Sequence, residues 1–206
     1  GTNKFVFRDP VFSINRKHTI ELCKEIIRQN LKIEYLIETH LKNLDDEMIP
    51  LLKESGLKLV YIGIESSDPK VLKDIKRFTI ANDEQQIIIN KLKNNDILVK
   101  SMFMFGNPED NEDSIKDTIS YSMKLSNQLV QYSVFTPYPG TPIFSHYENK
   151  IIEKRYDKFN QYNLTFKHKN LDNKKIKTLK NYGYKKFYLR LKNLPIIIKS
   201  GLSFFK

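Results

Sequence analysis

The chain has few of the residues that mark disulfide-rich, flexible or membrane-spanning proteins. Its 206 residues include one cysteine, seven glycines, eight prolines and no tryptophan. A single thiol, that of Cys23, excludes an internal disulfide and with it a secreted domain built on disulfides. Glycine and proline are too scarce for a linker-rich protein, and no apolar run reaches the roughly 18 residues that a membrane-spanning helix needs. With 40% apolar residues, the chain can bury one core, so we expect one main domain in the cytoplasm.

Positive charge is concentrated in the last quarter of the chain. The formal net charge is +11, and residues 150–206 hold 16 of the 35 Lys and Arg residues but only 3 of the 24 Asp and Glu residues. The simplest interpretation is a solvated helical surface, because runs of charge are usually exposed. A surface that binds an acidic partner or membrane headgroups is the alternative. No nucleic-acid-binding motif is present, so we expect no nucleic-acid partner.

Five apolar segments recur along the chain, and each is followed by a helical pattern. β-branched and aromatic residues dominate them and strict alternation is weak, which is typical of strands buried on both faces of a parallel sheet. Their ends are about 30 to 40 residues apart, the spacing of βαβ units. We therefore predict an α/β fold with parallel strands and right-handed crossovers. The segments cover residues 4–12, 31–40, 58–69, 96–106 and 128–140.

Helix signals lie between and after the strands. Residues 16–30 carry one apolar face, which includes Cys23 and places this cysteine in the core. Pro50 is compatible only with the first turn of a helix, and Asn82 begins a capping-box pattern. Residues 150–194 have an amphipathic pattern that predicts a helical tail.

Polar residues follow the carboxyl ends of the predicted strands. An open doubly wound sheet and a partial (β/α) barrel both fit the order of elements, and both form ligand sites at that edge. A lone acid there is more often a helix cap or a salt bridge, but several strands ending in polar groups are typical of a binding site. The GxGxxG and GxxxxGK[ST] motifs are absent, so nucleotide binding by those loops is not indicated. The residues at this edge are Asp9, Glu38, Thr39, His40, Glu65, Ser66 and Asn107.

Metal-binding patterns are weak. The histidines show no spacing typical of metal ligands. Asp9, Glu38 and Glu65 could ligate a hard cation, which leaves a metal-dependent lyase or hydrolase as a minor alternative.

Five segments, in order, resemble the radical SAM superfamily, specifically the subgroup that often carries an upstream cobalamin-binding domain. The first (FVFRDPVFSINRKHTIELCKEII) resembles the family's second strand and helix, and the second contains the motif GIES. The third (FMFGNPED) and the fourth (PYPGTPIF) resemble later strand-to-loop motifs, and the fifth (KKFYLR) resembles the helical tail. These segments are residues 5–27, 46–77, 103–119, 137–144 and 185–190.

The resemblance implies a partial (β/α) barrel of six parallel strands, of which this chain would supply all but the first. Residues 1–148 would form five βα units, and residues 149–206 a basic helical extension. It also implies S-adenosylmethionine at the carboxyl rim, beside a 4Fe-4S cluster. The cluster would pass on one electron, cleave the sulfonium and release a 5′-deoxyadenosyl radical that abstracts hydrogen from the substrate.

Particular residues receive roles from the same resemblance. Glu65 would accept hydrogen bonds from the ribose or the amino-acid end of the cofactor, a task that suits an acceptor-only carboxylate. Asp9 would meet the amino group, and residues 105–110 would approach the adenine. The family usually has an arginine where this chain has His40. The implied cofactor-binding set is Asp9, Glu38, His40, Glu65, Ser66, Phe105, Gly106, Asn107 and Pro137, and no catalytic residue is identified.

The departures from the family pattern are as informative. The cluster needs three cysteines, because thiolates hold its iron, and this chain has only Cys23. We therefore expect a fragment of a longer protein that supplies the cysteine loop, with no metal bound by this chain; a degenerate relative without redox chemistry is the alternative. The family loop Gly-x-Pro-Gly-Glu reads GNPED over residues 106–110. The lost glycine would cause strain if its position requires a positive φ.

The expected function is that of the cofactor-binding portion of a radical SAM enzyme. Such an enzyme modifies an unreactive carbon by methyl transfer or by ring or skeleton modification. The implied partners are a small-molecule or lipid-like substrate, an electron donor such as flavodoxin or ferredoxin, and cobalamin from an upstream domain. A non-catalytic binding module derived from the same barrel is the alternative. The apolar and basic end of the chain could contact a membrane surface, although packing on the barrel is the simpler expectation.

Overall fold

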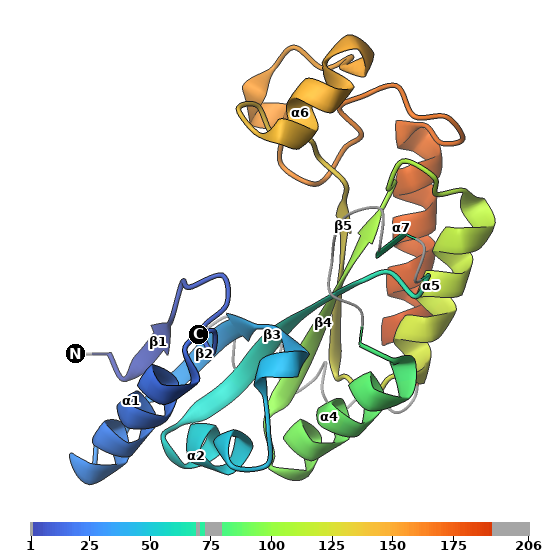
Figure 1. Ribbon diagram of the computed structural model, residues 1–206. Helices are drawn as coiled ribbons and strands as arrows, with labels where there is room; N and C mark the ends of the chain where they lie inside the picture. Colours follow the sequence, from blue (N-terminus) through green and yellow to red (C-terminus); the bar gives the residue numbers. More distant parts are fainter. Residues whose placement is uncertain (1, 69–70, 73–79, 191–206) are drawn as a thin grey trace. The chain divides into compact units, whose positions relative to one another are not determined.

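The computed structural model describes residues 2–68, 71–72 and 80–190 of the chain (Figure 1). Five parallel strands form one sheet of a partial (β/α) barrel, in the same order as in the sequence. The predicted alternation of strands and helices is confirmed. The strands are β1 (Lys4–Val6), β2 (Glu34–Thr39), β3 (Leu57–Glu65), β4 (Leu98–Phe105) and β5 (Leu129–Val134).

The described helices lie between the strands and after the last one. Within these ranges, no helix combines the length and apolar character needed to cross a membrane. The α-helices are α1 (Arg16–Arg28), α2 (Met48–Glu54), α4 (Asn82–Asn94), α5 (Glu112–Lys124), α6 (Pro142–Tyr147) and α7 (Asn173–Tyr188), and short 3-10 turns are η1 (Leu41–Asn43), η2 (Glu148–Lys150) and η3 (Tyr156–Lys158).

The chain divides into two compact units, and each is interrupted in sequence. The first unit contains most of β1 to β3, the beginning of β4 and the helices α1, α2 and α4. The second contains the end of β4, most of β5, and α5 to α7, so it includes residues on both sides of position 148. The first unit consists of residues 1–64, 80–102 and 124–130, and the second of residues 65–79, 103–123 and 131–206.

Tyr35 of β2 anchors the core of the first unit. Its side chain is buried, and its hydroxyl lies 2.7 Å from Oγ of Ser55 and donates to the carbonyl of Leu52 at 3.3 Å. Cys23 of α1 is 1% exposed and lies 3.9 Å from the same hydroxyl, which confirms its core position. Burial raises the pKa of this thiol. One tyrosine therefore ties α1 and α2 to the same strand.

The strands β2, β4 and β5 are fully buried on one face only. In β2, Tyr35 and Ile37 are buried, whereas Leu36 and Glu38 are half-buried, and β4 shows the same alternation. The expectation of burial on both faces was therefore wrong for these strands. The helices α1 and α2 cover the Tyr35 face, and the opposite face lines the interior of the partial barrel.

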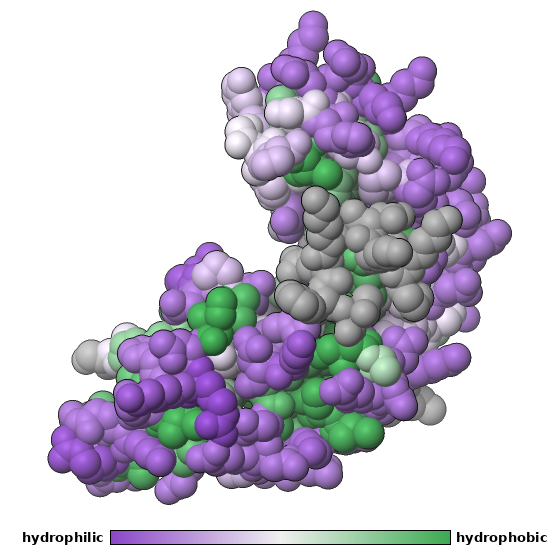
Figure 2. All heavy atoms as spheres, viewed as in Figure 1, coloured by the Kyte–Doolittle hydropathy of each residue, from purple (hydrophilic) through white to green (hydrophobic). Residues whose placement is uncertain are grey.

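In the second unit, α7 packs on β5 and α5. Gly183 allows this close approach, because a Cβ built there would lie 2.8 Å from Cε2 of Tyr132 and 3.2 Å from Cδ1 of Ile119. Figure 1 shows α5 and α7 running alongside each other, and Figure 2 shows hydrophilic residues over their outward faces. Part of the basic charge is thus on the exposed side of a docked helix.

Two helix predictions need correction. The tail was predicted as helical over residues 150–194; of its part that the structure describes, up to residue 190, only η3 and α7 are helical after position 150, and Leu164 and Phe166 are buried in irregular chain. The N-cap of α4 is not Asn82, as the capping-box pattern predicted. Ala81 is the N-cap, and the side chain of Gln85 donates to the carbonyl of Ile80 instead.

Candidate functional site

The loop after β4 is a tight, buried turn. Gly106 has φ +76°, and a Cβ there would lie 3.0 Å from Cδ2 of Leu164 and 3.3 Å from Cδ1 of Ile176, so only glycine fits without strain. Glu109, which replaces the second glycine of the family loop, does not have a positive φ. The backbone strain that a positive φ would cause at Glu109 is therefore absent.

Asp110 organises this loop from within. Its Oδ2 accepts from the backbone amide of Asn107 at 2.8 Å and from Nδ2 of Asn107 at 3.1 Å, and its Oδ1 accepts from Ser114 at 2.8 Å. The carboxylate is 3% exposed, and burial raises its pKa against these hydrogen bonds. Asp110 thus replaces the family glutamate with a carboxylate that folds the loop back on itself.

Asn107 places an unpaired polar atom in the loop after β4. The residue is 1% exposed, and its Nδ2 donates to the carbonyl of Met104 at 2.9 Å. Its Oδ1 is buried and has no hydrogen-bond partner among the described residues. Leaving a buried acceptor unpaired costs about 1–3 kcal/mol. A ligand N–H or O–H group directed at Oδ1 would remove that cost.

Glu65 ends β3 in an unusual conformation. It has φ +66° and is 8% exposed. A non-glycine residue in this region costs of order 1–3 kcal/mol, and such residues cluster at ligand sites. The neighbouring Ser66 is buried, and its Oγ accepts from the amide of Asp68 at 3.1 Å, so its hydroxyl supports the turn after the strand.

The half-buried face of the first unit carries a charged cluster. Nζ of Lys100 lies 4.4 Å from the ring centroid of Tyr61, a cation–π contact. Burial lowers the pKa of Lys100, and Glu38 opposes that shift. Burial and Glu38 raise the pKa of Tyr61, while Arg8 lowers it. Glu38 therefore shares its surroundings with a cation and a phenol that the sequence analysis did not select.

The other predicted residues of the first unit have simpler environments. Nδ1 of His40 accepts from the amide of Lys42 at 3.2 Å and caps η1. Asp9 is exposed. These two and Glu38 belong to the first unit, and their participation in a cofactor site remains a prediction.

The remaining predicted residues all belong to the second unit. Phe105 is fully buried, and its ring stacks on Tyr132 with centroids 4.8 Å apart, so it supports the loop from the core. Pro137 is buried after the end of β5. The second-unit members of the predicted set are Glu65, Ser66, Phe105, Gly106, Asn107 and Pro137.

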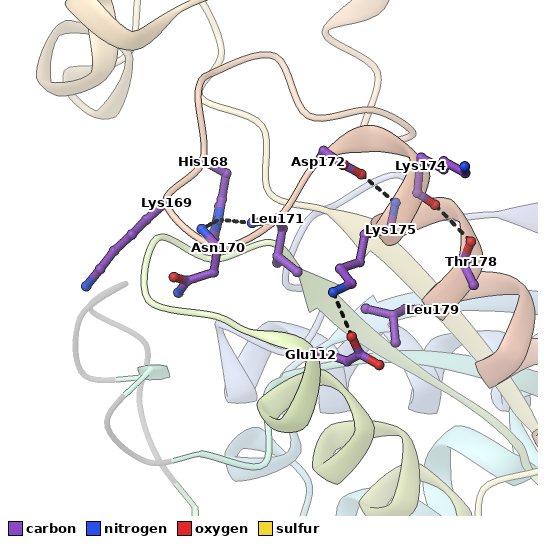
Figure 3. Close-up of a pocket in the computed structure, with 10 residues that line it drawn as sticks. All are labelled: Glu112, His168, Lys169, Asn170, Leu171, Asp172, Lys174, Lys175, Thr178 and Leu179. Atoms are coloured by element: carbon purple, nitrogen blue, oxygen red, sulfur yellow. Dashed lines mark hydrogen bonds and ion pairs between the residues drawn. The ribbon is translucent and has the colours of Figure 1, made fainter.

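A surface hollow of about 530 Å³ lies beside this loop in the second unit (Figure 3). Lys175 of α7 pairs with Glu112 of α5 at 2.8 Å across it, and the hydrogen bonds of Lys116 and Lys175 lower the pKa of Glu112 to about 2. His168 and Asn170 line the same hollow. Sequence reasoning missed both residues, because neither belongs to a recognisable motif.

The chain belongs to the radical SAM superfamily. The family described as "Radical SAM superfamily" matches residues 9–121, more than half of the chain. The chain is 26% identical over 196 residues to an uncharacterized methyltransferase of Pyrococcus horikoshii, covering 94% of this chain and 42% of that protein. It is also 26% identical over 173 residues to the bacteriochlorophyllide d C-12(1)-methyltransferase of Chlorobaculum tepidum, covering 84% of this chain and 38% of that protein.

A solved structure shows the same fold. The radical S-adenosylmethionine methyltransferase TsrM of Kitasatospora setae, with cobalamin and a [4Fe-4S] cluster bound, aligns with a TM-score of 0.65 at 17% identity. The alignment covers 71% of this chain and 28% of TsrM. The chain thus spans about two fifths of the two curated relatives and less of TsrM.

The residues of this chain fit the two family cofactors differently. The only cysteine is the buried Cys23, and no described group of three or more His, Cys, Asp or Glu residues could hold a metal. The chain therefore does not fit an iron–sulfur cluster. The buried acceptor of Asn107 does fit an adenosyl ligand, whose amino and hydroxyl groups are donors.

Proposed function

We propose that the chain is the S-adenosylmethionine-binding portion of a radical SAM enzyme of the cobalamin-binding type. The observation that carries this proposal is the buried, unpartnered Oδ1 of Asn107 in the loop after β4. A chain of this superfamily that keeps a buried acceptor without a donor has the chemistry to bind an adenosyl group. The position of this loop supports the proposal, because it follows the carboxyl end of a parallel strand, where α/β sheets bind ligands.

The end of β3 and the loop after β4, both in the second unit, would contribute contacts to the cofactor. In the second unit, Asn107 would accept a hydrogen bond from the adenine amino group, and Glu65 would accept from the ribose hydroxyls. S-adenosylmethionine supplies a sulfonium whose cleavage yields the reactive adenosyl group. The protein side chains named here bind and orient it.

The whole protein would modify an unreactive carbon of a small molecule. Methyl transfer is the favoured reaction, because two of the similar proteins are described as methyltransferases and TsrM is another. Ring or skeleton modification is the alternative. The cluster cysteines, a cobalamin site and the docking site for a flavodoxin- or ferredoxin-like electron donor would come from outside these 206 residues. We place this reaction in the cytoplasm.

Binding is the first test of the proposal. Equilibrium dialysis with S-adenosylhomocysteine should show binding to the 206-residue chain, and Asn107→Leu should weaken it about tenfold, which corresponds to about 1.4 kcal/mol. Asn181→Leu, an exposed change on α7 of the same unit, is the matched control and should bind normally. Unaltered affinity of the Asn107 variant would show that Oδ1 does not contact the ligand.

Catalysis needs the natural full-length protein. When the full-length protein is reduced under anaerobic conditions in the presence of S-adenosylmethionine, it should release 5′-deoxyadenosine or transfer the methyl group to the substrate. Binding of S-adenosylmethionine without either product, by a protein that also lacks a cluster, would favour the non-catalytic binding module. Absence of any binding would overturn both functions.

A further inference from the structure

A short segment far along the chain holds the loop after β4. Nε2 of His168 lies 2.8 Å from the carbonyl oxygen of Asn107, and Nδ2 of Asn170 donates to the carbonyl of Asp110 at 3.0 Å. Between them, Lys169 pairs with Glu109 at 3.4 Å. Three consecutive residues, here called the latch (residues 168–170), therefore contact three residues of one loop.

The hydrogen bonds of His168 define its tautomer. Nδ1 accepts from the backbone amides of Asn170 at 3.0 Å and Leu171 at 3.2 Å (Figure 3). Nδ1 therefore carries no proton, Nε2 carries one, and the neutral ring donates to the carbonyl of Asn107. The ring is 9% exposed. A neutral, buried imidazole thus shapes the latch with one nitrogen and binds the loop with the other.

These bonds determine where Oδ1 of Asn107 points. The carbonyl of Asn107 accepts from His168 and from the amide of Asp110 at 2.8 Å, so its peptide group is held on two sides. Its Nδ2 is occupied by the carbonyl of Met104 and by Asp110. Because the backbone and Nδ2 of Asn107 are both held by hydrogen bonds, the direction of its Oδ1 is fixed as well.

We propose that the latch is a positioning element for S-adenosylmethionine: His168 and Asn170 hold the loop so that Oδ1 of Asn107 is preoriented toward the ligand. This inference rests on the proposed function. A preoriented acceptor binds more tightly because less conformational freedom is lost on binding. Packing supports the same arrangement, since Leu164 and Ile176, on either side of the latch, cover Gly106.

Two substitutions of His168 separate its two nitrogens. His168→Asn keeps an acceptor near the position of Nδ1 but removes the donor to Asn107, whereas His168→Gln can keep a donor near the position of Nε2. Asn181→Ala, an exposed change on α7 of the same unit, is the control. Asn170→Ala is a second, independent test of the latch if both His168 variants unfold.

Hydrogen–deuterium exchange of the ligand-free chain tests the latch by itself. In His168→Asn and Asn170→Ala, amides of residues 106–110 should exchange at least about tenfold faster than in the wild type, while exchange in the first unit should not change. His168→Gln and Asn181→Ala should exchange nearly as the wild type does. Unchanged loop exchange in both His168→Asn and Asn170→Ala would overturn the inference.

Affinity for S-adenosylhomocysteine then tests positioning. His168→Asn should weaken binding several-fold, and His168→Gln should restore most of it, a rescue that general destabilisation would not give. If the amides of the loop exchange faster but the affinity for S-adenosylhomocysteine does not change, the latch only stabilises the loop. That result would overturn the proposal that it positions the ligand. The wild-type chain could fail to bind S-adenosylhomocysteine while hydrogen–deuterium exchange in the variants changes as expected. The proposed function would then be wrong, and the latch would only hold the loop in place.

Discussion

The backbone amide of Tyr132 in β5 donates a 3.0 Å hydrogen bond to the hydroxyl of Tyr184 on α7. β5 is the last strand of the sheet, so its outer side would otherwise present unpaired amides. Two residues further on, the amide of Val134 donates to the carbonyl of Gln161 at 2.8 Å. The segment that follows β5 in the chain therefore closes the edge that β5 leaves open.

Tyr184→Phe should destabilise the protein by about 1–3 kcal/mol, because the partly buried amide of Tyr132 loses its acceptor while the ring is kept. Urea unfolding followed by circular dichroism would measure the change. Tyr182→Phe, at an exposed position on the same helix, should alter stability by less than about 0.5 kcal/mol. Equal effects of the two changes would mean that the bond to β5 contributes nothing.

Gly183→Ala should destabilise the protein even though alanine is the better helix former. The gain in helix propensity is at most about 1 kcal/mol, whereas overpacking typically costs about 1–3 kcal/mol. The new methyl group would lie 2.8 Å from the ring of Tyr132. Thermal unfolding should show a lower midpoint for this variant. Asn181→Ala, exposed on the same helix, should leave the midpoint unchanged or raise it.

Glu112 should give the stability a defined pH dependence. Lys116 and Lys175 lower its pKa from 4.5 to about 2. Because the folded state binds this proton more weakly than the unfolded state, the pairing stabilises the protein above about pH 4.5 and is lost as the pH falls toward about 2. Glu112→Gln should therefore be less stable than the wild type at about pH 7, and the difference should close in acid. About 1 M NaCl should shrink the difference, because the pair is exposed.

Cys23 should be unreactive in the native protein. It is 1% exposed, and burial raises the pKa of its thiol, so little of the reactive thiolate is present. Ellman's reagent should label one thiol in denaturant and almost none without it. The same chain mixed with ferrous iron and sulfide should show no thiolate-to-iron absorbance. Rapid native labelling, or a stable cluster, would contradict the core position of this residue.

The order of elements was predictable from the sequence, because apolar segments of strand length alternate with helical patterns in a parallel α/β fold. The five strands lie within or close to the predicted segments. The extent of the tail helix was not predictable from amphipathic pattern alone, since Leu164 and Phe166 reach the core from irregular chain. The helix begins only where Asp172 caps it by accepting from the amide of Lys175 at 2.7 Å.

The candidate site was predictable only in part. Asn107 and Gly106 could be selected because they follow a strand in a family motif. The unpaired oxygen of Asn107 and the positive φ of Glu65 depend on hydrogen bonds and backbone angles that no sequence pattern specifies. His168 could not be selected, because its role depends on a contact with a loop 61 residues earlier in the chain.

The interrupted second unit has a consequence for synthesis and for truncation. During translation the loop after β4 leaves the ribosome well before residues 161–188, which supply the cover over Gly106, the latch and the edge pairing of β5. Until then the nascent chain displays an open strand edge, a hazard for aggregation. A protein cut at residue 148 would remain permanently at that stage, so the loop after β4 and α7 must be expressed together.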